Sequence, residues 1–364
     1  MEKNRSIIKL PQYLLGSELQ RDFNRIYSVE GSSVNVENVP ETFQSQDLMR
    51  IMNKLTYDST TFNAARSNRA GMINEISNED KELLENGILD KPPFNDMHKN
   101  TPPSTAGRLE GKYCYACGNM AKFQEFHDLV VFKNPNPLNF EKKHLEDYLD
   151  ISFLIFEEAE KLKREKLNLS KHHIFHRVIG WNSLWKAGSS IPHGHLQTLL
   201  YTDYPPMDII RARDSFLRYN EIHGSHRDIF RDIFNIHNKL ELGIKNKNTD
   251  LMVTITPKKE KEIILYTHVT NNEKESRASL VDSVYKSLRC LIDDFQVNSF
   301  NMSLSQLPLK AYGLSKRDVY LTRIVDRGNI SNRTGDIAFM ELLMGENIVS
   351  ADPYDVMEKL KGHF

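Results

Sequence analysis

A strict alternation of positions marks the middle of the chain. His193, His195 and Gln197 stand at every second position, separated by a glycine and a leucine. Because residues i, i+2 and i+4 of a strand point to the same face, the pattern predicts a strand over 193–201 that carries all three polar side chains together. Imidazole is a competent nucleophile at neutral pH, so this face is a candidate catalytic surface.

The other periodic segments predict a mixture of strands and helices. A stripe of apolar residues from Leu145 to Leu162 repeats at helical spacing and predicts a long helix over 140–166. Further helices are expected at 17–27, 44–54, 207–219 and 278–294. Strands are expected at 127–132, 173–179, 240–244, 251–255, 263–266 and 299–304. Residues 70–112, rich in Asn, Glu and Pro, are expected to form an irregular connection.

The order of these elements repeats along the chain. A histidine precedes an asparagine by 38 residues in the first half (His144, Asn182) and by 33 in the second (His268, Asn301). The second half has no His-x-His. We therefore expect an α+β protein of two similar halves, each an antiparallel β-sheet with packed helices. The predicted divisions are an N-terminal extension (1–55), a catalytic half (56–235) and a degenerate second half (236–364).

Composition argues against several classes of partner. The chain has 48 Lys and Arg against 49 Asp and Glu, a net charge of −1, which gives no support for a nucleic-acid or membrane-surface role. No apolar run reaches membrane-spanning length. Three cysteines cannot form a disulfide framework, and no secretory signal is recognisable, so a reduced, cytoplasmic setting is expected.

Small and basic residues suited to binding phosphate lie upstream of the histidines. Glycine lets a backbone approach a phosphate group closely, and guanidinium groups bind phosphate through two hydrogen bonds. The candidates are Arg66, Arg69, Asn182, Lys186, Gly188, Ser189 and Ser190. The alternatives are a solvated arginine pair, a solvated lysine and a loop-capping asparagine.

The pair Cys114 and Cys117 is a candidate metal site. Two thiolates at this spacing on a tight turn suit tetrahedral zinc. No second Cys-x-x-Cys is present, so the other ligands would be histidine or carboxylate, and His144 and His193 are the best candidates. A redox pair or two small buried apolar residues is the alternative. His144 could equally be an exposed residue at the start of a helix.

These residues together resemble the galactose-1-phosphate uridylyltransferase branch of the histidine-triad (HIT) superfamily. That branch includes dinucleoside-polyphosphate and nucleoside-diphosphate-hexose phosphorylases. The resemblance is carried by Asn182, Gly188, Ser190, His193, His195 and Gln197. Hydrolases of the superfamily have a further histidine at the position of Gln197, so the motif favours the transferase side. Gly194 stands where the uridylyltransferases have proline.

The resemblance implies two HIT-like halves and a role for each residue of the motif. His195 would accept the nucleotidyl group, and Gln197 would hydrogen-bond a non-bridging oxygen of the intermediate. The phosphate site would be lined by Gly188, Ser189 and Ser190.

The resemblance also implies a structural zinc ion and further nucleotide contacts. The zinc ligands would be Cys114, Cys117, His193 and His144, with Asn136 as the alternative to His144. The contacts to nucleotide phosphate, ribose or base would come from Arg66, Arg69 and Asn134.

The expected activity is transfer of a nucleoside monophosphate through a covalent histidyl intermediate. The donor would be a nucleoside diphosphate sugar or a dinucleoside polyphosphate. The acceptor would be a sugar 1-phosphate, as in a uridylyltransferase, or inorganic phosphate, as in a phosphorylase. Hydrolysis of such donors and non-catalytic nucleotide binding remain alternatives, and the resemblance is compatible with a homodimer.

Overall fold

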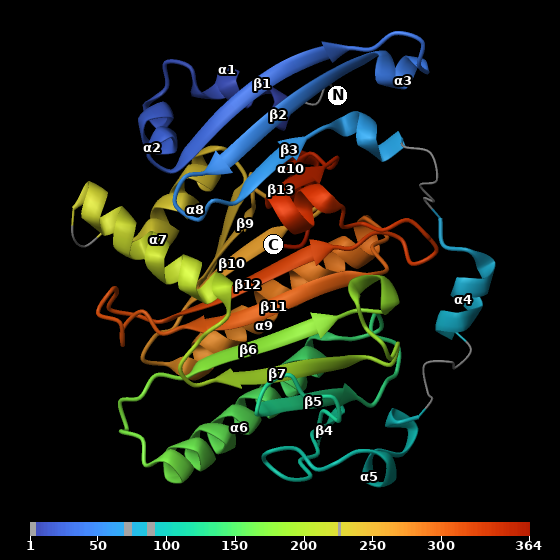
Figure 1. Ribbon diagram of the computed structural model, residues 1–364, viewed down its shortest axis with the longest axis vertical. Helices are drawn as coiled ribbons and strands as arrows, with labels where there is room; N and C mark the ends of the chain where they lie inside the picture. The colour runs from blue at the N-terminus through green and yellow to red at the C-terminus, as the bar shows by residue number, and fades with distance from the viewer. Residues whose placement is uncertain (1–4, 69–74, 86–91, 225–226) are drawn as a thin grey trace.

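The protein combines helices with two β-sheets, which confirms the predicted α+β class (Figure 1). Its computed structural model describes residues 5–68, 75–85, 92–224 and 227–364. Within these ranges, no helix is both long enough and apolar enough to cross a bilayer.

The larger sheet has nine strands in the order β4-β5-β7-β6-β11-β12-β10-β9-β8, and all neighbouring strands are antiparallel. Their bounds are β4 (Cys114–Gly118), β5 (Phe126–Phe132), β6 (His176–Asn182), β7 (His195–Tyr201), β8 (Gly243–Asn246), β9 (Thr249–Val253), β10 (Ile263–His268), β11 (Phe300–Leu307) and β12 (Val319–Asp326). Each strand expected from the sequence is present with shifted ends. The strands β4 and β12 were not expected.

The strand order reads the same from either edge once β8 is left out. The first half contributes β4, β5, helix α6 (Lys142–Leu167), β6 and β7, and the second contributes β9, β10, helix α9 (Glu273–Arg289), β11 and β12. The halves meet where β6 pairs with β11, and Asn182 lies opposite Asn301. The two predicted sheets are therefore one continuous sheet, because each half's open edge strand finds its hydrogen-bond partners in the other half.

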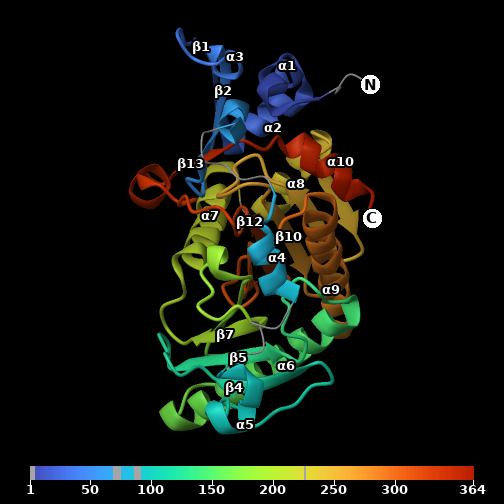
Figure 2. The same ribbon diagram turned by 90° about the vertical axis from the view of Figure 1, so that its right-hand side faces the viewer.

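One face of this sheet, the helix face, is apolar and covered by α6 and α9. Trp181, Leu196, Leu304 and Ile324 on this face are buried, and the Phe132 ring stacks on Tyr148 of α6 with centroids 3.9 Å apart. Figure 2 shows both helices on the same side of the sheet. The period of two along each strand places the polar residues on the opposite face.

The smaller sheet lies at one end of the molecule and joins both ends of the chain (Figures 1 and 2). Its strands, in the order β1-β2-β3-β13, are β1 (Tyr27–Asn35), β2 (Ser45–Asn53), β3 (Ser59–Phe62) and β13 (Glu346–Val349). The pair β3–β13 is parallel and the other pairs are antiparallel.

The helix predicted over 44–54 is wrong, because β2 occupies this segment. Met49, Ile51 and Asn53 are buried at every second position. All nine residues of β2 pair with β1. The same residues fit a helical stripe only loosely, and pairing with a neighbouring strand decides between the two structures.

The remaining α-helices surround the two sheets. They are α1 (Leu10–Leu14), α2 (Glu18–Ile26), α3 (Glu41–Gln44), α4 (Asn78–Glu85), α5 (Met97–Asn100), α7 (Met207–His223), α8 (Ile229–Lys239) and α10 (Pro353–Lys361). Asp352, which caps α10, accepts hydrogen bonds from the Ser6 hydroxyl at 2.6 Å and the Ile7 amide at 3.0 Å. This contact fixes the N-terminal region against the C-terminal helix.

Candidate functional site

His195 and Gln197 share one face of β7, as the alternation predicts. His195 lies opposite Val131 of β5, and Gln197 lies between Leu129 of β5 and Gly180 of β6. We call this surface, which carries His195, Gln197 and, further along the sheet, Ser303 and Arg323, the site face. The residue between the two, Leu196, is fully buried on the helix face.

The His195 ring is held in one tautomer. Its Nδ1 lies 2.8 Å from the backbone oxygen of His193. A carbonyl oxygen only accepts hydrogen bonds, so Nδ1 must carry the proton and Nε2 the lone pair. Burial lowers the pKa of the His195 imidazole, and the hydrogen bond to the His193 backbone offsets this only in part. His195 is 8% exposed, and its ring is therefore neutral at neutral pH.

Gln197 is oriented by a histidine that sequence reasoning treated only as part of a strand. The Gln197 Oε1 and the His127 Nε2 lie 2.9 Å apart, and Asn119 Nδ2 lies 2.9 Å from the same ring nitrogen. Burial lowers the pKa of His127, which keeps this ring neutral as well. The polar centre of the first half is thus uncharged.

Phe94 covers both histidines and was also missed. Its ring centroid lies 5.4 Å from the rings of His193 and His195, edge to face in both cases. Phe94 packs in an apolar cluster with Met97 and Cys117. Phe94 belongs to residues 70–112, which were expected to form an irregular connection. A single aromatic residue among polar ones carries no periodic signal, so the sequence did not indicate its contact with the histidines.

The loop after β6 is shaped for a close turn and is held by the second half. Gly188 adopts φ +92°, a left-handed conformation that glycine tolerates best. The Asn301 side chain donates to Asn182 Oδ1 at 2.7 Å and to the Ala187 carbonyl at 2.9 Å. Gly188 and Ser190 are exposed, whereas Ser189 is buried and its hydroxyl donates to the Ile191 carbonyl at 2.5 Å. Gly188 and Ser190 are therefore the reachable members of the predicted phosphate site.

Steric crowding explains why glycine stands between the two histidines. A Cβ at Gly194 would overlap the Phe132 ring and lie 3.2 Å from the Cα of Pro137. The Gly194 amide donates to the Pro135 carbonyl at 2.8 Å. Proline at this position would lose that hydrogen bond and collide with Phe132.

The four predicted zinc ligands do not form a zinc site. Cys114 and Cys117 lie on a strand, not on a tight turn, and a separation of three residues sends their side chains to opposite faces of β4. Cys114 faces α6, with its Sγ 3.3 Å from Asp147 Oδ2, whereas Cys117 lies in the Phe94 cluster. Burial raises the pKa of the Cys117 thiol to about 11.

The predicted histidine ligands have other partners. His144 caps α6, where its Nδ1 accepts from the Glu141 amide at 3.1 Å, and its ring packs on Tyr113. His193 Nε2 lies 2.7 Å from the Phe132 carbonyl. In the described ranges, only Cys290, Asp294 and His363 bring three or more such ligand atoms together. The four predicted ligands are therefore not brought together in this structure, and no step of the chemistry is assigned to zinc.

The other predicted nucleotide contacts are scattered. Lys186 donates to the carbonyls of Asn332, at 3.2 Å, and of Thr334. The Asn134 side chain closes a turn by donating to the Asn139 carbonyl at 3.1 Å. The Asn136 side chain closes another turn by accepting from the Leu138 amide at 2.9 Å.

The arginine pair is only partly described. Arg66 lies on a short 3-10 helix, Ala64–Asn68, which contacts β2 of the smaller sheet. Arg69 lies outside the described residues. The structure therefore places Lys186 in the Gly188 loop, with its ammonium group bound to backbone carbonyls, and places Arg66 beside the smaller sheet.

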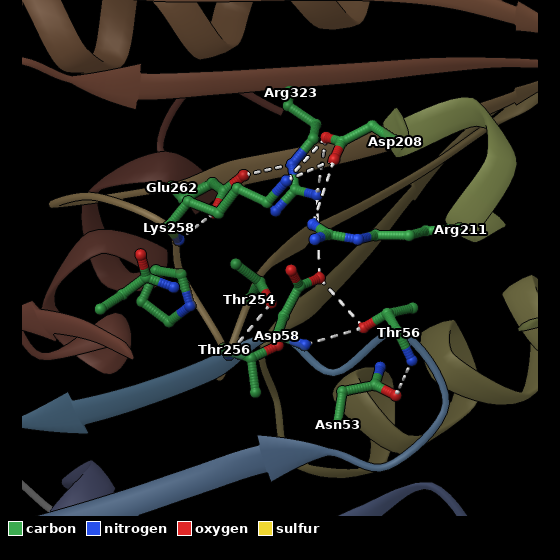
Figure 3. A network of polar contacts seen from close by, with 12 residues as sticks. Asn53, Thr56, Asp58, Asp208, Arg211, Thr254, Thr256, Lys258, Glu262 and Arg323 are labelled. Carbon is green, nitrogen blue, oxygen red and sulfur yellow. Dashed lines mark hydrogen bonds and ion pairs between the residues drawn. The ribbon is translucent and has the colours of Figure 1, made fainter. Parts of the chain in front are cut away.

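The second half carries a different polar centre on the same site face (Figure 3). Across the sheet, Gln197 is followed by Gly180, Ser303 and Arg323, one on each successive strand. Arg323 is therefore three strand spacings, roughly 14 Å, from Gln197. It borders a cavity that is lined also by Tyr27, Asp58, Asp208 and Tyr266.

Ion pairs fill this second centre. Arg323 Nε donates to Glu262 at 2.6 Å, and its Nη1 lies 3.7 Å from Asp208 and 3.9 Å from Asp58. Burial would lower the pKa of Arg323, and the carboxylates of Glu262, Asp58 and Asp208 more than offset this and raise it. Lys258 pairs with Asp208 at 2.7 Å. No periodic pattern in the sequence indicates this network, because it joins four separate segments.

The fold matches a known group of structures. An ADP-glucose phosphorylase from Arabidopsis thaliana, solved with bound ADP-glucose, has a TM-score of 0.58 and 14% identity, over 87% of this chain and 98% of that one. A uridylyltransferase has a TM-score of 0.54 and 15% identity, over 75% of this chain and 92% of that one. A GalT-like protein from Arabidopsis thaliana has a TM-score of 0.52 and 14% identity, over 72% and 88%.

No protein-family model matches the chain, and no curated protein is similar to it in sequence. At the identities above, the likeness concerns the fold. The protein therefore shares the fold of these structures, which is the fold that the resemblance of its central motif implies.

Proposed function

We propose that this protein transfers a nucleoside monophosphate from a nucleoside diphosphate compound to a phosphate-bearing acceptor through a covalent bond to His195. The hydrogen bond between Nδ1 and the His193 carbonyl carries the proposal, because it leaves a neutral ring with a free lone pair on Nε2.

The reaction has two displacement steps. In the first, the Nε2 lone pair attacks the α-phosphorus of the donor, the bond from phosphorus to the leaving phosphate oxygen breaks, and that oxygen keeps the electron pair. The ring then carries a positive charge next to the His193 carbonyl, which stabilises it. In the second step an oxygen of the acceptor attacks the same phosphorus, and the electron pair of the P–N bond returns to Nε2.

Neighbouring groups supply positioning. Gln197, two residues along the same face, places an amide beside the reacting ring, and its contact with His127 limits its rotation. The exposed Ser190 hydroxyl offers a donor to a phosphate oxygen, whereas the Gly188 amide already donates to the Trp185 carbonyl at 3.0 Å. Phe94 shields the ring edge from water, which favours transfer over hydrolysis.

The similar folds narrow the first choice of substrates. One of them binds ADP-glucose and another is a uridylyltransferase, so ADP-sugars and UDP-sugars are the first donors to test. Inorganic phosphate and sugar 1-phosphates are the corresponding acceptors. Dinucleoside polyphosphates offer the same α-phosphorus and leaving phosphate and form the second group of donors.

The test is the mass of the intact protein after incubation with each donor. We expect one added AMP or UMP moiety in the natural chain and none in His195→Ala. His98→Ala is the matched control, because His98 is exposed on α5. Addition of the acceptor should remove the adduct. An adduct that persists in His195→Ala would refute the proposal.

A further inference from the structure

The end of the C-terminal helix meets the end of α9 at a cluster of three different ligand types. Cys290 and Asp294 belong to a single π-helical turn that follows α9, and His363 follows α10. One ligand atom of each residue lies within 4.8 Å of the other two. This cluster is on neither polar centre of the site face.

Local structure explains why the residues meet. Cys290 and Asp294 are four positions apart, so a helical turn places them on the same side. A π-turn is uncommon, and such turns often occur where a helix serves a specific site. His363 approaches from the other helix, with its Nε2 2.8 Å from Asp294 Oδ2.

The burial of the three side chains is graded. Cys290 is fully buried, whereas the side chains of His363 and Asp294 are 23% and 38% exposed. A metal ion could therefore enter from solvent and bind the Cys290 thiolate on its buried side. A water molecule could occupy the remaining coordination position on its exposed side. Thiolate, imidazole and carboxylate are the ligands that zinc takes in proteins, and three protein ligands with one water complete a tetrahedral site.

We propose that Cys290, Asp294 and His363 bind one divalent transition-metal ion, best matched by zinc, which joins the end of α10 to the end of α9. The nearest cation, Lys359, leaves the Asp294 carboxylate free for this role. Its ammonium group donates to the Asp294 backbone carbonyl at 2.5 Å and lies 4.1 Å from the Phe295 ring centroid.

The simpler explanation is an ion pair between His363 and Asp294 with no metal. The chain contains a natural comparison, because His268 and Asp250 form a similar pair at 3.0 Å. That pair belongs to no group of three ligands in the described part of the chain. The thiol is therefore the feature that separates a metal site from an ion pair.

Cobalt(II) and zinc titrations of the full chain after chelator dialysis test the proposal. We expect one ion per chain and a cobalt–thiolate absorption band in the near ultraviolet. Cys290→Ala should abolish the band, and His363→Gln should weaken zinc binding by about tenfold or more, the least expected when a metal site loses even a supporting group.

Two controls make the result specific. Cys117→Ala removes another buried cysteine, and His268→Gln breaks the comparison ion pair; neither should change the stoichiometry or the band. Circular dichroism verifies that each variant is folded, and the partly exposed His363 allows a test that leaves the core intact. No cobalt–thiolate band in the natural chain, or a band that survives Cys290→Ala, would overturn the proposal.

Discussion

The two halves of the large sheet have the same strand order and opposite polar chemistry on their shared site face. In the first half, His195, Gln197 and His127 form a neutral group, and burial lowers the pKa of both imidazoles. In the second half, the same face carries Arg323, which is paired with the Glu262, Asp208 and Asp58 carboxylates.

The difference separates reactivity from stability. A neutral imidazole with a free lone pair contributes little to the stability of the fold, and its lone pair is available for bond formation. A buried arginine in a network of carboxylates has no nucleophilic atom, but removing it leaves charges without partners. The proposed reaction would therefore use one half of the large sheet, whereas the ion-pair network of the other half stabilises the fold.

The largest expected effect is in the second half. Arg323→Met leaves the buried Glu262 carboxylate without its cation, so we expect the free energy of unfolding to fall by about 3–5 kcal/mol. Denaturant unfolding measures the change. His195→Ala should lower that stability far less, although it abolishes the adduct.

A double variant sharpens this prediction. Arg323→Met combined with Glu262→Gln removes both charges and keeps an amide oxygen for the Lys258 amide, which donates to Glu262 at 2.6 Å. Much of the lost stability should return. If Arg323→Met alone costs under about 1 kcal/mol, the network is not the stabilising element described here.

A smaller effect is expected at the seam, the β6–β11 pairing where the two halves of the sheet meet. Asn301→Ala removes the hydrogen bonds to Asn182 and Ala187, so we expect a loss of about 1–2 kcal/mol in unfolding free energy. Because these bonds hold the Gly188 loop, adduct formation should slow by about tenfold. Single-turnover labelling measures the rate.

Ser305→Ala is the matched control for the seam, since Ser305 lies on the same strand and face as Asn301. It should change neither quantity. A normal labelling rate in Asn301→Ala would mean that the second half does not support the reactive loop.

The smallest effect concerns pH. The lowered pKa of His195 keeps its ring neutral at pH values below the ordinary pKa of about 6.5, so labelling should persist to more acidic pH than with an ordinary histidine. Reactivity is lost as the pH falls through the lowered pKa. A midpoint at or above pH 6.5 in the labelling rate would contradict the burial argument.

The second half should be insensitive in this range. Burial would raise the pKa of Asp208, and Lys258 and Arg323 more than offset this and lower it. Its stabilisation is complete above the unfolded value of about 3.9 and is lost only as the pH falls through the lowered value. The contribution of Asp208 to stability should therefore stay constant at every pH above about 3.9.

Local periodicity was sufficient for much of the fold. The alternation at 193–197 predicted the strand and its shared face, and the apolar stripe at 145–162 predicted α6. Repetition of the element order predicted two related halves, and Asn182 and Asn301 indeed face each other. These signals can be read from the order of residues in this one chain, so they can be recognised without an alignment of homologues.

Contacts distant in sequence were the source of the errors. The segment 44–54 is a strand because β1 pairs with it, and Cys114 and Cys117 are separated because β4 continues through both. Phe94 reaches the histidines across a stretch with no periodic pattern. Rules based on neighbouring residues cannot identify these partners, because the partners are distant in the sequence.

By itself, the sequence determined which side chains share a strand face, because the period of two is a property of the backbone. Only the tertiary structure decided which tautomer His195 adopts, which loop Asn301 holds and that both halves join in one sheet. These depend on which groups from distant segments satisfy each other's hydrogen bonds and charges, and that choice is made when the chain packs.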